Sequence, residues 1–265
     1  MFLRFFVLAI SLLLFITGCS EYSKILKSND FNLKYEAANK YYEEGDYYKA
    51  YALFDELMTI YNGTTRAEEM YFKMAYCDYN LGFYSLSATR FNIFYKRYPL
   101  SENAEEALFL SALSNYKNSP VHSLDQTDTY RAINNLQLFI NKYPESNRVD
   151  TCNTLVEKLR DKLEKKYYDM AYLYHHMDRH KAAVIAFNNL LEDFPDTDYK
   201  EKALFYQLKS QYLLAYNSIE SKKRKRYEDV KDSYIKFVDY FPSSSFIKQA
   251  EGFYEQTTKA LTKNE

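Results

Sequence analysis

Four segments of the chain share one order of apolar and polar positions. Each has an apolar pair, two further residues, an aromatic residue, proline, any residue, and then serine or threonine. An aromatic side chain can close a helix, proline stops it, and serine or threonine can cap the next helix. The pattern therefore predicts helix endings that recur along the chain. The segments are residues 94–101, 139–146, 190–197 and 237–244, with a degenerate fifth copy at 57–64.

A second pattern lies inside these units. Gly45 and Gly82 each separate two amphipathic stretches, and alanine stands seven residues before each of them, at Ala38 and Ala75. Glycine suits the left-handed conformation that often ends a helix, and the small alanine lets paired helices approach. In a later unit, Asp178 occupies the position of the glycine. The pattern predicts pairs of helices joined by tight turns.

These positions together resemble the tetratricopeptide repeat, a helix-turn-helix unit of about 34 residues. The resemblance covers about residues 30–255 and implies an all-α solenoid of about five units. We expect insertions around residues 119–128 and 217–226, and a long helix from about 148 to 177. The alternative is a non-repetitive helical bundle. The matching positions are Gly45, Tyr47, Ala50, Phe54, Ala75, Gly82, Tyr84, Phe91 and Pro99.

Composition narrows the possible chemistry. Glycine and proline each number 5 among 265 residues, which disfavours sandwiches and barrels that need many tight turns. The motifs GxGxxG, GxxxxGK[ST], GxSxG and HExxH are absent. The net charge of -1 gives no overall attraction to nucleic acid. We therefore expect no enzyme, with no catalytic residue, no metal, no cofactor and no nucleic-acid partner.

The N-terminus has the pattern of an export signal. Arg4 precedes an apolar run from Phe5 to Ile16, which is too short for a comfortable membrane span and suits a signal peptide. The run ends in Ile16-Thr17-Gly18-Cys19, which resembles a bacterial lipobox with Ile16 in place of the usual leucine. We expect cleavage before Cys19 and lipidation of its thiol, so that acyl chains anchor the protein to a membrane. An ordinary signal peptide or a short anchor helix is the alternative.

The expected organisation follows from these signals. Residues 1–18 form the signal peptide and 19–29 a lipidated tether. Residues 30–146 hold repeats 1 to 3, residues 147–255 hold repeats 4 and 5, and residues 256–265 form a tail. Two cysteines, Cys77 and Cys152, remain after Cys19, and we expect them to be buried free thiols.

Tyrosine is unusually abundant, with 29 residues, and tryptophan is absent. In this repeat class the exposed face of the first helix usually lines a groove. That frame predicts an aromatic groove for peptides, because tyrosine combines apolar area with a hydrogen-bonding tip. The alternative is that the rings pack between helices. The candidate binding residues are Tyr35, Asn39, Tyr42, Phe72, Tyr76 and Tyr79, and the same frame also exposes Asn32, Glu43, Glu69 and Asn80.

Two further clusters contain side chains that could bind a ligand. Five consecutive cations, Lys222, Lys223, Arg224, Lys225 and Arg226, lie in the expected insertion of repeat 5. They are either a solvated loop or a contact with anionic headgroups or an acidic partner. His175, His176 and His180 include a pair at i,i+4, but no cysteine ligand lies nearby, so the sequence favours no metal site.

The lipobox, the short tether, the five units and their helix endings together resemble the BamD family of outer membrane protein assembly factors. The resemblance implies a lipoprotein of the outer membrane, facing the periplasm, in the complex that inserts β-barrel proteins. Its N-terminal repeats would bind targeting segments of unfolded outer membrane proteins. Its C-terminal repeats would dock the periplasmic domains of the core barrel subunit, for which we expect repeats 4 and 5 with the run Lys222–Arg226.

Three alternative functions remain open at this point. One is a repeat lipoprotein that serves as a scaffold for division or peptidoglycan machinery. Another is a glycan-binding lipoprotein of nutrient uptake, although such proteins usually carry tryptophan platforms and this chain has no tryptophan. The third is a lipid-anchored enzyme, for which the sequence offers no site.

Overall fold

The computed structural model describes residues 21–263, so the expected signal peptide, the lipobox and Cys19 lie outside the described residues. Every regular element between residues 21 and 263 is a helix, which confirms the all-α prediction. After a helical stretch at residues 21–26, the helices are α2 (Phe31–Glu43), α3 (Tyr47–Met58), α4 (Thr65–Asn80), α5 (Tyr84–Arg97), α6 (Ala104–Asn118), α7 (Thr127–Lys142), α8 (Val149–His176), α9 (His180–Asp193), α10 (Lys200–Tyr216), α11 (Glu220–Tyr240) and α12 (Ile247–Lys263).

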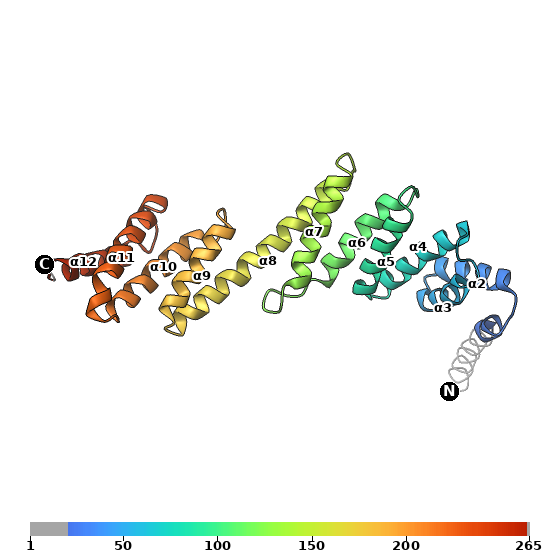
Figure 1. Ribbon diagram of the computed structural model, residues 1–265, viewed down its shortest axis with the longest axis horizontal. Helices are drawn as coiled ribbons and strands as arrows, with labels where there is room; N and C mark the ends of the chain where they lie inside the picture. The colour runs from blue at the N-terminus through green and yellow to red at the C-terminus, as the bar shows by residue number, and fades with distance from the viewer. Residues whose placement is uncertain (1–20, 264–265) are drawn as a thin grey trace, which may run out of the picture. The chain divides into compact units, whose positions relative to one another are not determined.

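Helices α2 to α11 form consecutive helix-turn-helix pairs, and α12 follows the last pair; the ribbon can be traced through them in chain order from blue to red (Figure 1). Prolines 99, 144, 195 and 242 follow the second helix of a pair, as the sequence predicts. The predicted long helix is α8. Helix α12 continues through Lys263, so most of the expected tail is helical. Within residues 21–263, no helix is both long and apolar enough to span a membrane.

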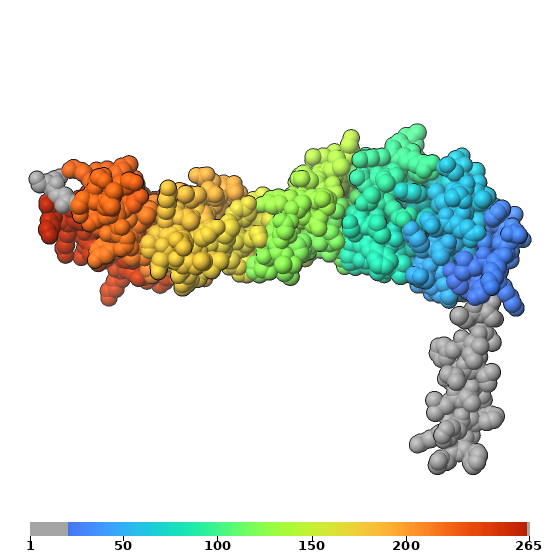
Figure 2. Space-filling model, turned by 60° about the horizontal axis from the view of Figure 1, so that its bottom comes forward, coloured from blue at the N-terminus to red at the C-terminus, as the bar shows by residue number. Residues whose placement is uncertain are grey.

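Contacts divide the chain into two compact units. Among the described residues, the first unit comprises residues 21–120 and Thr127–Val156, and the second comprises Val121–Gln126 and residues 157–263. Within each unit the helices follow one another as adjacent bands of surface (Figure 2). Each unit has its own core, in which the phenylalanines of the repeat pattern, such as Phe54, Phe91 and Phe187, are completely buried.

Three inter-helix turns have the same backbone structure. Gly45, Gly82 and Asp178 have φ values of +78°, +81° and +55°. In each turn the residue after the left-handed position donates its amide hydrogen back to the helix, from Asp46 to the Tyr41 carbonyl and at the equivalent places of the other two turns. This is the hydrogen-bond pattern of a Schellman C-cap. The structure thereby confirms that Asp178 takes the glycine position of the repeat.

The two predicted insertions have different outcomes. Residues 119–126 do form a connection between α6 and α7, as expected. The insertion predicted at 217–226 is wrong, because α11 already begins at Glu220 and includes all five cations from Lys222 to Arg226. Charges of opposite sign at helical spacing stabilise this segment as a helix. Lys223 pairs with Glu220 at 2.7 Å, Lys225 pairs with Asp229 at 3.1 Å, and Tyr227 is buried beneath them.

Candidate functional site

The first helices of repeats 1 and 2 are joined by a row of polar contacts. Tyr35 on α2 donates its hydroxyl hydrogen to Glu69 Oε2 on α4 at 2.7 Å. Lys73, one turn after Glu69 on α4, donates to Asn39 Oδ1 at 2.7 Å and to Glu69 Oε1 at 2.6 Å. Two candidate residues from the sequence, Tyr35 and Asn39, are therefore held by the same pair of charged side chains.

Cations lie over the tyrosine rings of this row. The Arg66 guanidinium carbon is 4.7 Å from the centre of the Tyr35 ring, and Lys73 Nζ is 5.4 Å from the centre of the Tyr42 ring. Burial raises the pKa of Tyr35, and its bond to Glu69 adds to that effect. Burial alone would raise the pKa of Glu69, but the hydrogen bonds from Lys73 and Tyr35 bring it below its usual value. Glu69 is therefore a carboxylate at neutral pH.

The row continues from repeat 2 to repeat 3. Tyr76 on α4 donates to Glu106 Oε1 on α6 at 2.7 Å. Glu106 also lies 3.6 Å from Arg148 Nη2, and the Arg148 guanidinium covers the Phe109 ring at 4.7 Å. Burial and the bond to Glu106 both raise the pKa of Tyr76, so it stays a hydrogen-bond donor. We call this row the first-helix ladder; it consists of Tyr35, Asn39, Arg66, Glu69, Lys73, Tyr76, Glu106 and Arg148.

The other three candidate rings contact the second helix of their own repeat. Tyr42 meets Tyr47 edge-on with ring centres 5.8 Å apart, and Tyr79 meets Tyr84 in the same way at 5.6 Å. Phe72 lies against Phe94 at 5.1 Å and also contacts Phe91. All six candidate side chains are half-buried. These rings therefore contribute to packing, while part of each ring stays exposed. Their role in binding a ligand stays a prediction.

Sequence reasoning missed four members of the ladder: Arg66, Lys73, Glu106 and Arg148. For Arg66 and Lys73, the sequence spacing offered a signal. Residues 34 positions apart meet between α2 and α4, as in Asn32 with Arg66 and Asn39 with Lys73. The partner of Tyr76 is instead 30 residues away, at Glu106, so no single spacing finds the whole ladder.

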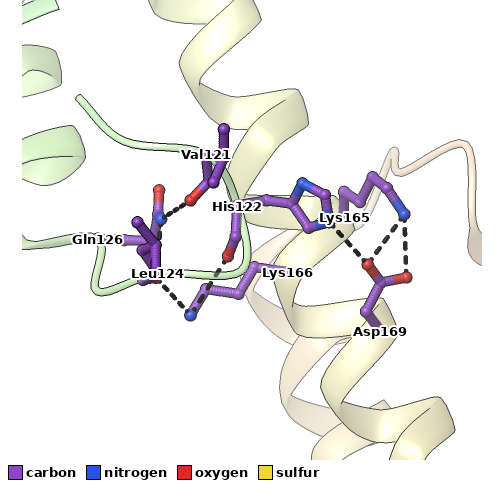
Figure 3. Close-up of polar contacts among 7 residues, drawn as sticks. All are labelled: Val121, His122, Leu124, Gln126, Lys165, Lys166 and Asp169. Atoms are coloured by element: carbon purple, nitrogen blue, oxygen red, sulfur yellow. Dashed lines mark hydrogen bonds and ion pairs between the residues drawn. The ribbon is translucent and has the colours of Figure 1, made fainter.

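The insertion between α6 and α7 is fixed to α8 within the second unit (Figure 3). Lys166 Nζ donates to the carbonyl oxygens of Leu124 at 2.7 Å and His122 at 3.3 Å. The buried Gln126 side chain donates to the carbonyl oxygens of Val121 and Leu124, both at 2.9 Å. The segment is therefore an ordered loop whose backbone acceptors are satisfied by two side chains.

Asp169 adds a charged contact beside this loop. His122 Nε2 lies 3.2 Å from Asp169 Oδ2, and Lys165 Nζ lies 2.9 Å from the same oxygen (Figure 3). A hollow of about 240 Å³ opens next to it and is bounded by His122, Met170 and Leu173. Val121 and Leu124 remain well exposed at the tip of the loop.

Two of the three candidate histidines, His175 and His180, are buried in the second unit. His175 is buried, and its Nδ1 lies 2.8 Å from Ser210 Oγ on α10. Burial lowers the pKa of His175 to about 4, so its ring is neutral at pH 7. His180 is the first residue of α9. No group of three or more His, Cys, Asp or Glu residues in the described part of the chain could hold a metal ion.

The fold and this surface define the chain as a helical-repeat protein with a polar and aromatic ladder on its first helices. The chain belongs to the outer membrane lipoprotein family YfiO, whose profile matches residues 28–228. A curated relative, the outer membrane protein assembly factor BamD of Pasteurella multocida (strain Pm70), is 22% identical over 199 residues. That alignment covers 71% of this chain and 76% of the relative.

A solved structure also aligns with the chain. It is the crystal structure of a TPR repeats protein from Bacteroides fragilis, with 15% sequence identity and a TM-score of 0.42. The alignment covers 88% of this chain and 100% of the other.

Proposed function

We propose that this protein is a non-catalytic component of the machinery that assembles and inserts β-barrel proteins in the outer membrane. Membership of the outer membrane lipoprotein family and the similarity to an assembly factor support this role. In this proposal it acts at the periplasmic face of the outer membrane, anchored by lipid on Cys19. Loss of labelled palmitate incorporation in Cys19→Ala tests the anchor by itself.

The first-helix ladder, together with the adjacent rings of Tyr42, Phe72 and Tyr79, is the proposed site for targeting segments of unfolded barrel substrates. One observation carries this assignment: half-buried tyrosine rings lie beside charged side chains. Tyr35 is hydrogen-bonded to Glu69, and Tyr76 is hydrogen-bonded to Glu106. An extended segment with aromatic side chains could pack on the exposed ring surfaces and bond to the polar tips. Arg66, Lys73 and Arg148 supply positive charge for a carboxylate of the ligand.

Crosslinking to a peptide from the C-terminus of a barrel protein tests this site. We expect Tyr76→Ala with Tyr79→Ala to reduce crosslinking at least tenfold. Tyr48→Ala is a matched control, because Tyr48 is 73% exposed and lies on α3 outside the ladder. Unchanged crosslinking in the double variant, with the thermal unfolding midpoint preserved, would remove the ladder from the proposal.

Repeats 4 and 5 are the proposed docking region for the periplasmic domains of the core barrel subunit. On α11 three of the five consecutive cations have acidic partners three or four residues away, and Arg226 Nη1 bonds to Ser218 Oγ. Lys222 is exposed, and so are Arg224 and Lys225 beside their carboxylate partners. An acidic partner surface could compete for these cations, since exposed ion pairs are weak.

Copurification after mild detergent extraction tests the docking region. Replacing the five cations by glutamine should lower recovery of the core subunit, while helix content by circular dichroism stays unchanged. Lys96→Gln with Lys142→Gln is the control for lost charge, because both lysines are exposed and lie on α5 and α7, outside repeats 4 and 5. If recovery of the core subunit is undiminished, the five cations form a solvated helix face and not a docking contact. Recovery of division or peptidoglycan proteins in place of the barrel machinery would favour the scaffold function.

A further inference from the structure

The start of the described chain is packed onto repeat 1. Residues 21–26 form a helical stretch, in which Tyr22 and Ile25, three positions apart, lie on the same side and pack against the core of the first unit. Tyr22 meets Tyr41 of α2 edge-on with ring centres 5.6 Å apart, and Lys49 Nζ lies over both rings at 5.7 and 5.0 Å. The helical stretch is therefore held in place by repeat 1.

The connection from this stretch to α2 is also ordered. Ser28 donates its amide hydrogen to the Ile25 carbonyl at 3.0 Å, and Ser28 Oγ accepts from the Asp30 amide at 3.1 Å. Asp30 then caps α2, because its side chain accepts hydrogen bonds from the amides of Asn32 and Leu33, both at 3.0 Å. The chain between the helical stretch and α2 therefore follows one defined path.

Three large apolar side chains of this region are left exposed. Leu26 and Phe31 are each 38% exposed, and Leu33 is 48% exposed. Leu33 also borders a hollow of about 370 Å³ together with Glu21 and Ile25, so the helical stretch and α2 share this surface. Exposed apolar side chains that gather in one region mark a contact with a partner or a membrane. We call this surface the N-terminal apolar face; it consists of Ile25, Leu26, Phe31 and Leu33.

Covalent structure places the N-terminal apolar face close to the proposed lipid anchor, so the inference rests on lipidation of Cys19. Two residue steps separate Cys19 from Glu21, and even an extended chain covers no more than about 7 Å over them. Leu33 borders the same hollow as Glu21. The acyl chains of a lipidated cysteine lie in the hydrocarbon, and the polar layer outside it is only about 5–8 Å deep on each side of a bilayer. The face therefore lies within reach of the lipid headgroups.

We propose that the N-terminal apolar face inserts into the interfacial layer of the membrane that holds the anchor, so that repeat 1 lies against a phospholipid surface. Insertion of leucine and phenylalanine at the boundary of headgroups and acyl chains removes apolar area from water. Lys24 and Lys27 are exposed on the same segment, and no ion pair among residues 21–263 includes either of them. Their ammonium groups can contact lipid phosphates while their apolar stems lie along the interface. Lipid is the occupant because an acylated Cys19 brings it to the face before any other partner arrives.

This contact would orient the protein, which acyl chains alone do not. A lipid on a single residue holds the chain at the membrane and leaves its rotation free. An inserted face that is packed onto repeat 1 fixes which side of that repeat is turned to the lipid. Tyr35, the first residue of the first-helix ladder, lies two positions after Leu33 on α2. The ladder would therefore begin next to the membrane surface.

Tryptophan fluorescence tests the proposal without background, because the chain contains no tryptophan. The lipidated full-length chain with Leu33→Trp is reconstituted in vesicles of phosphatidylethanolamine and phosphatidylglycerol, with or without phospholipid brominated on its acyl chains. We expect the brominated lipid to reduce the emission at least twofold. Leu86→Trp is the matched control, because Leu86 is 54% exposed on α5 and lies outside the face. Its emission should change by less than a tenth.

A second set of variants tests whether the leucines cause the insertion. With Phe31→Trp as the reporter, Leu26→Glu combined with Leu33→Glu should abolish quenching by the brominated lipid. Leu86→Glu, with the same reporter, should leave the quenching unchanged. Both leucines of the face are exposed, so helix content by circular dichroism should stay the same in the double variant. Quenching that persists in the double variant would overturn the proposal.

Flotation of the vesicles and the mass of the N-terminal peptide separate the anchor from the face. If Cys19 carries no lipid and the protein does not float with the vesicles, the proposed anchor fails and the inference fails with it. If the lipidated protein floats but the brominated lipid leaves Leu33→Trp unquenched, the anchor stands and the inference alone is overturned. A blue-shifted emission without quenching has the same meaning, since a protein surface and not lipid then covers the face.

Discussion

Tyr76 on α4 donates its hydroxyl hydrogen to Glu106 on α6 across 2.7 Å, and this bond joins the first helices of repeats 2 and 3. The same ring meets Phe72 and Phe91 with centres 5.3 and 5.5 Å away. The residue therefore combines packing within its repeat with a polar contact to the next one. In a helical-repeat protein, such contacts between neighbours contribute much of the cooperativity of folding.

Removal of the Tyr76 hydroxyl alone should destabilise the first unit modestly. Tyr76→Phe keeps the ring contacts and leaves Glu106 with Arg148 only, so we expect a loss of about 1 kcal/mol. Urea unfolding followed by circular dichroism measures it. Tyr48→Phe, at an exposed ring, provides the baseline, and an equal midpoint for both variants would contradict the prediction.

Acidification should weaken the second unit through its buried histidines. Burial lowers the pKa of His175 to about 4, and burial also lowers the pKa of His180. Between about pH 6.5 and 4, the unfolded chain binds protons that the folded chain excludes, so the free energy of unfolding falls as the pH falls. For His175 the loss approaches about 3 kcal/mol at pH 4, taking about 1.4 kcal/mol for each pH unit.

Stability curves of variants separate this effect from that of the carboxylates. His175→Gln should flatten the pH dependence between pH 6.5 and 4, whatever it does to the stability at pH 7. His176→Gln, at an exposed ring on the same helix, should keep the slope of the unaltered chain. If the His175→Gln slope also matches that of the unaltered chain, the buried imidazole is not the cause.

The loop between α6 and α7 should open when Lys166 is replaced. Lys166→Met removes both hydrogen bonds to the loop carbonyls, and a charged hydrogen bond contributes about 1.5–3 kcal/mol. We expect amide hydrogen exchange across residues 121–126 to accelerate about tenfold or more. Lys165→Met is the adjacent control, because Lys165 contacts Asp169 at the surface and no loop carbonyl. Equal exchange in the two variants would show that the hydrogen bonds from Lys166 do not hold the loop.

Asp178 should be a site where glycine stabilises the chain. Its φ of +55° is unfavourable for a side chain with Cβ, whereas glycine adopts it freely. We expect Asp178→Gly to raise the free energy of unfolding by about 1 kcal/mol. Gly82→Asp is the reverse test at the equivalent turn, where an added Cβ would meet no atom within 4 Å. Gly82→Asp should therefore lower the free energy of unfolding by about 1 kcal/mol through backbone strain alone, and thermal unfolding measures this change.

The repeat could be predicted because its signals are local. Pro99 ends a helix by itself, and Gly82 or Asp178 needs only its own turn. The start of α11 was misjudged because a run of five cations, taken alone, indicates a solvated loop. The carboxylates of Glu228 and Asp229, which follow one turn later, make the same run a stable helix.

The candidate site was harder to predict because its parts come from different helices. Tyr35 and Tyr76 could be placed on an exposed helix face from spacing alone. Their partners depend on how neighbouring helices are rotated, which is set by core packing and not by the repeat pattern. Glu106 shows this most clearly, because it lies 30 residues from its partner Tyr76, whereas Lys73 lies 34 residues from its partner Asn39.

The two described cysteines have a practical consequence for spectroscopy. Cys77 and Cys152 are fully buried, and burial raises their thiol pKa to about 12 and about 11. Thiolate is the reactive form, so at neutral pH neither residue competes for maleimide reagents in the folded chain. Over residues 21–263 the protein is therefore a ready scaffold for spin labels or fluorophores, in which a single introduced surface cysteine reports its own position without removal of the native pair.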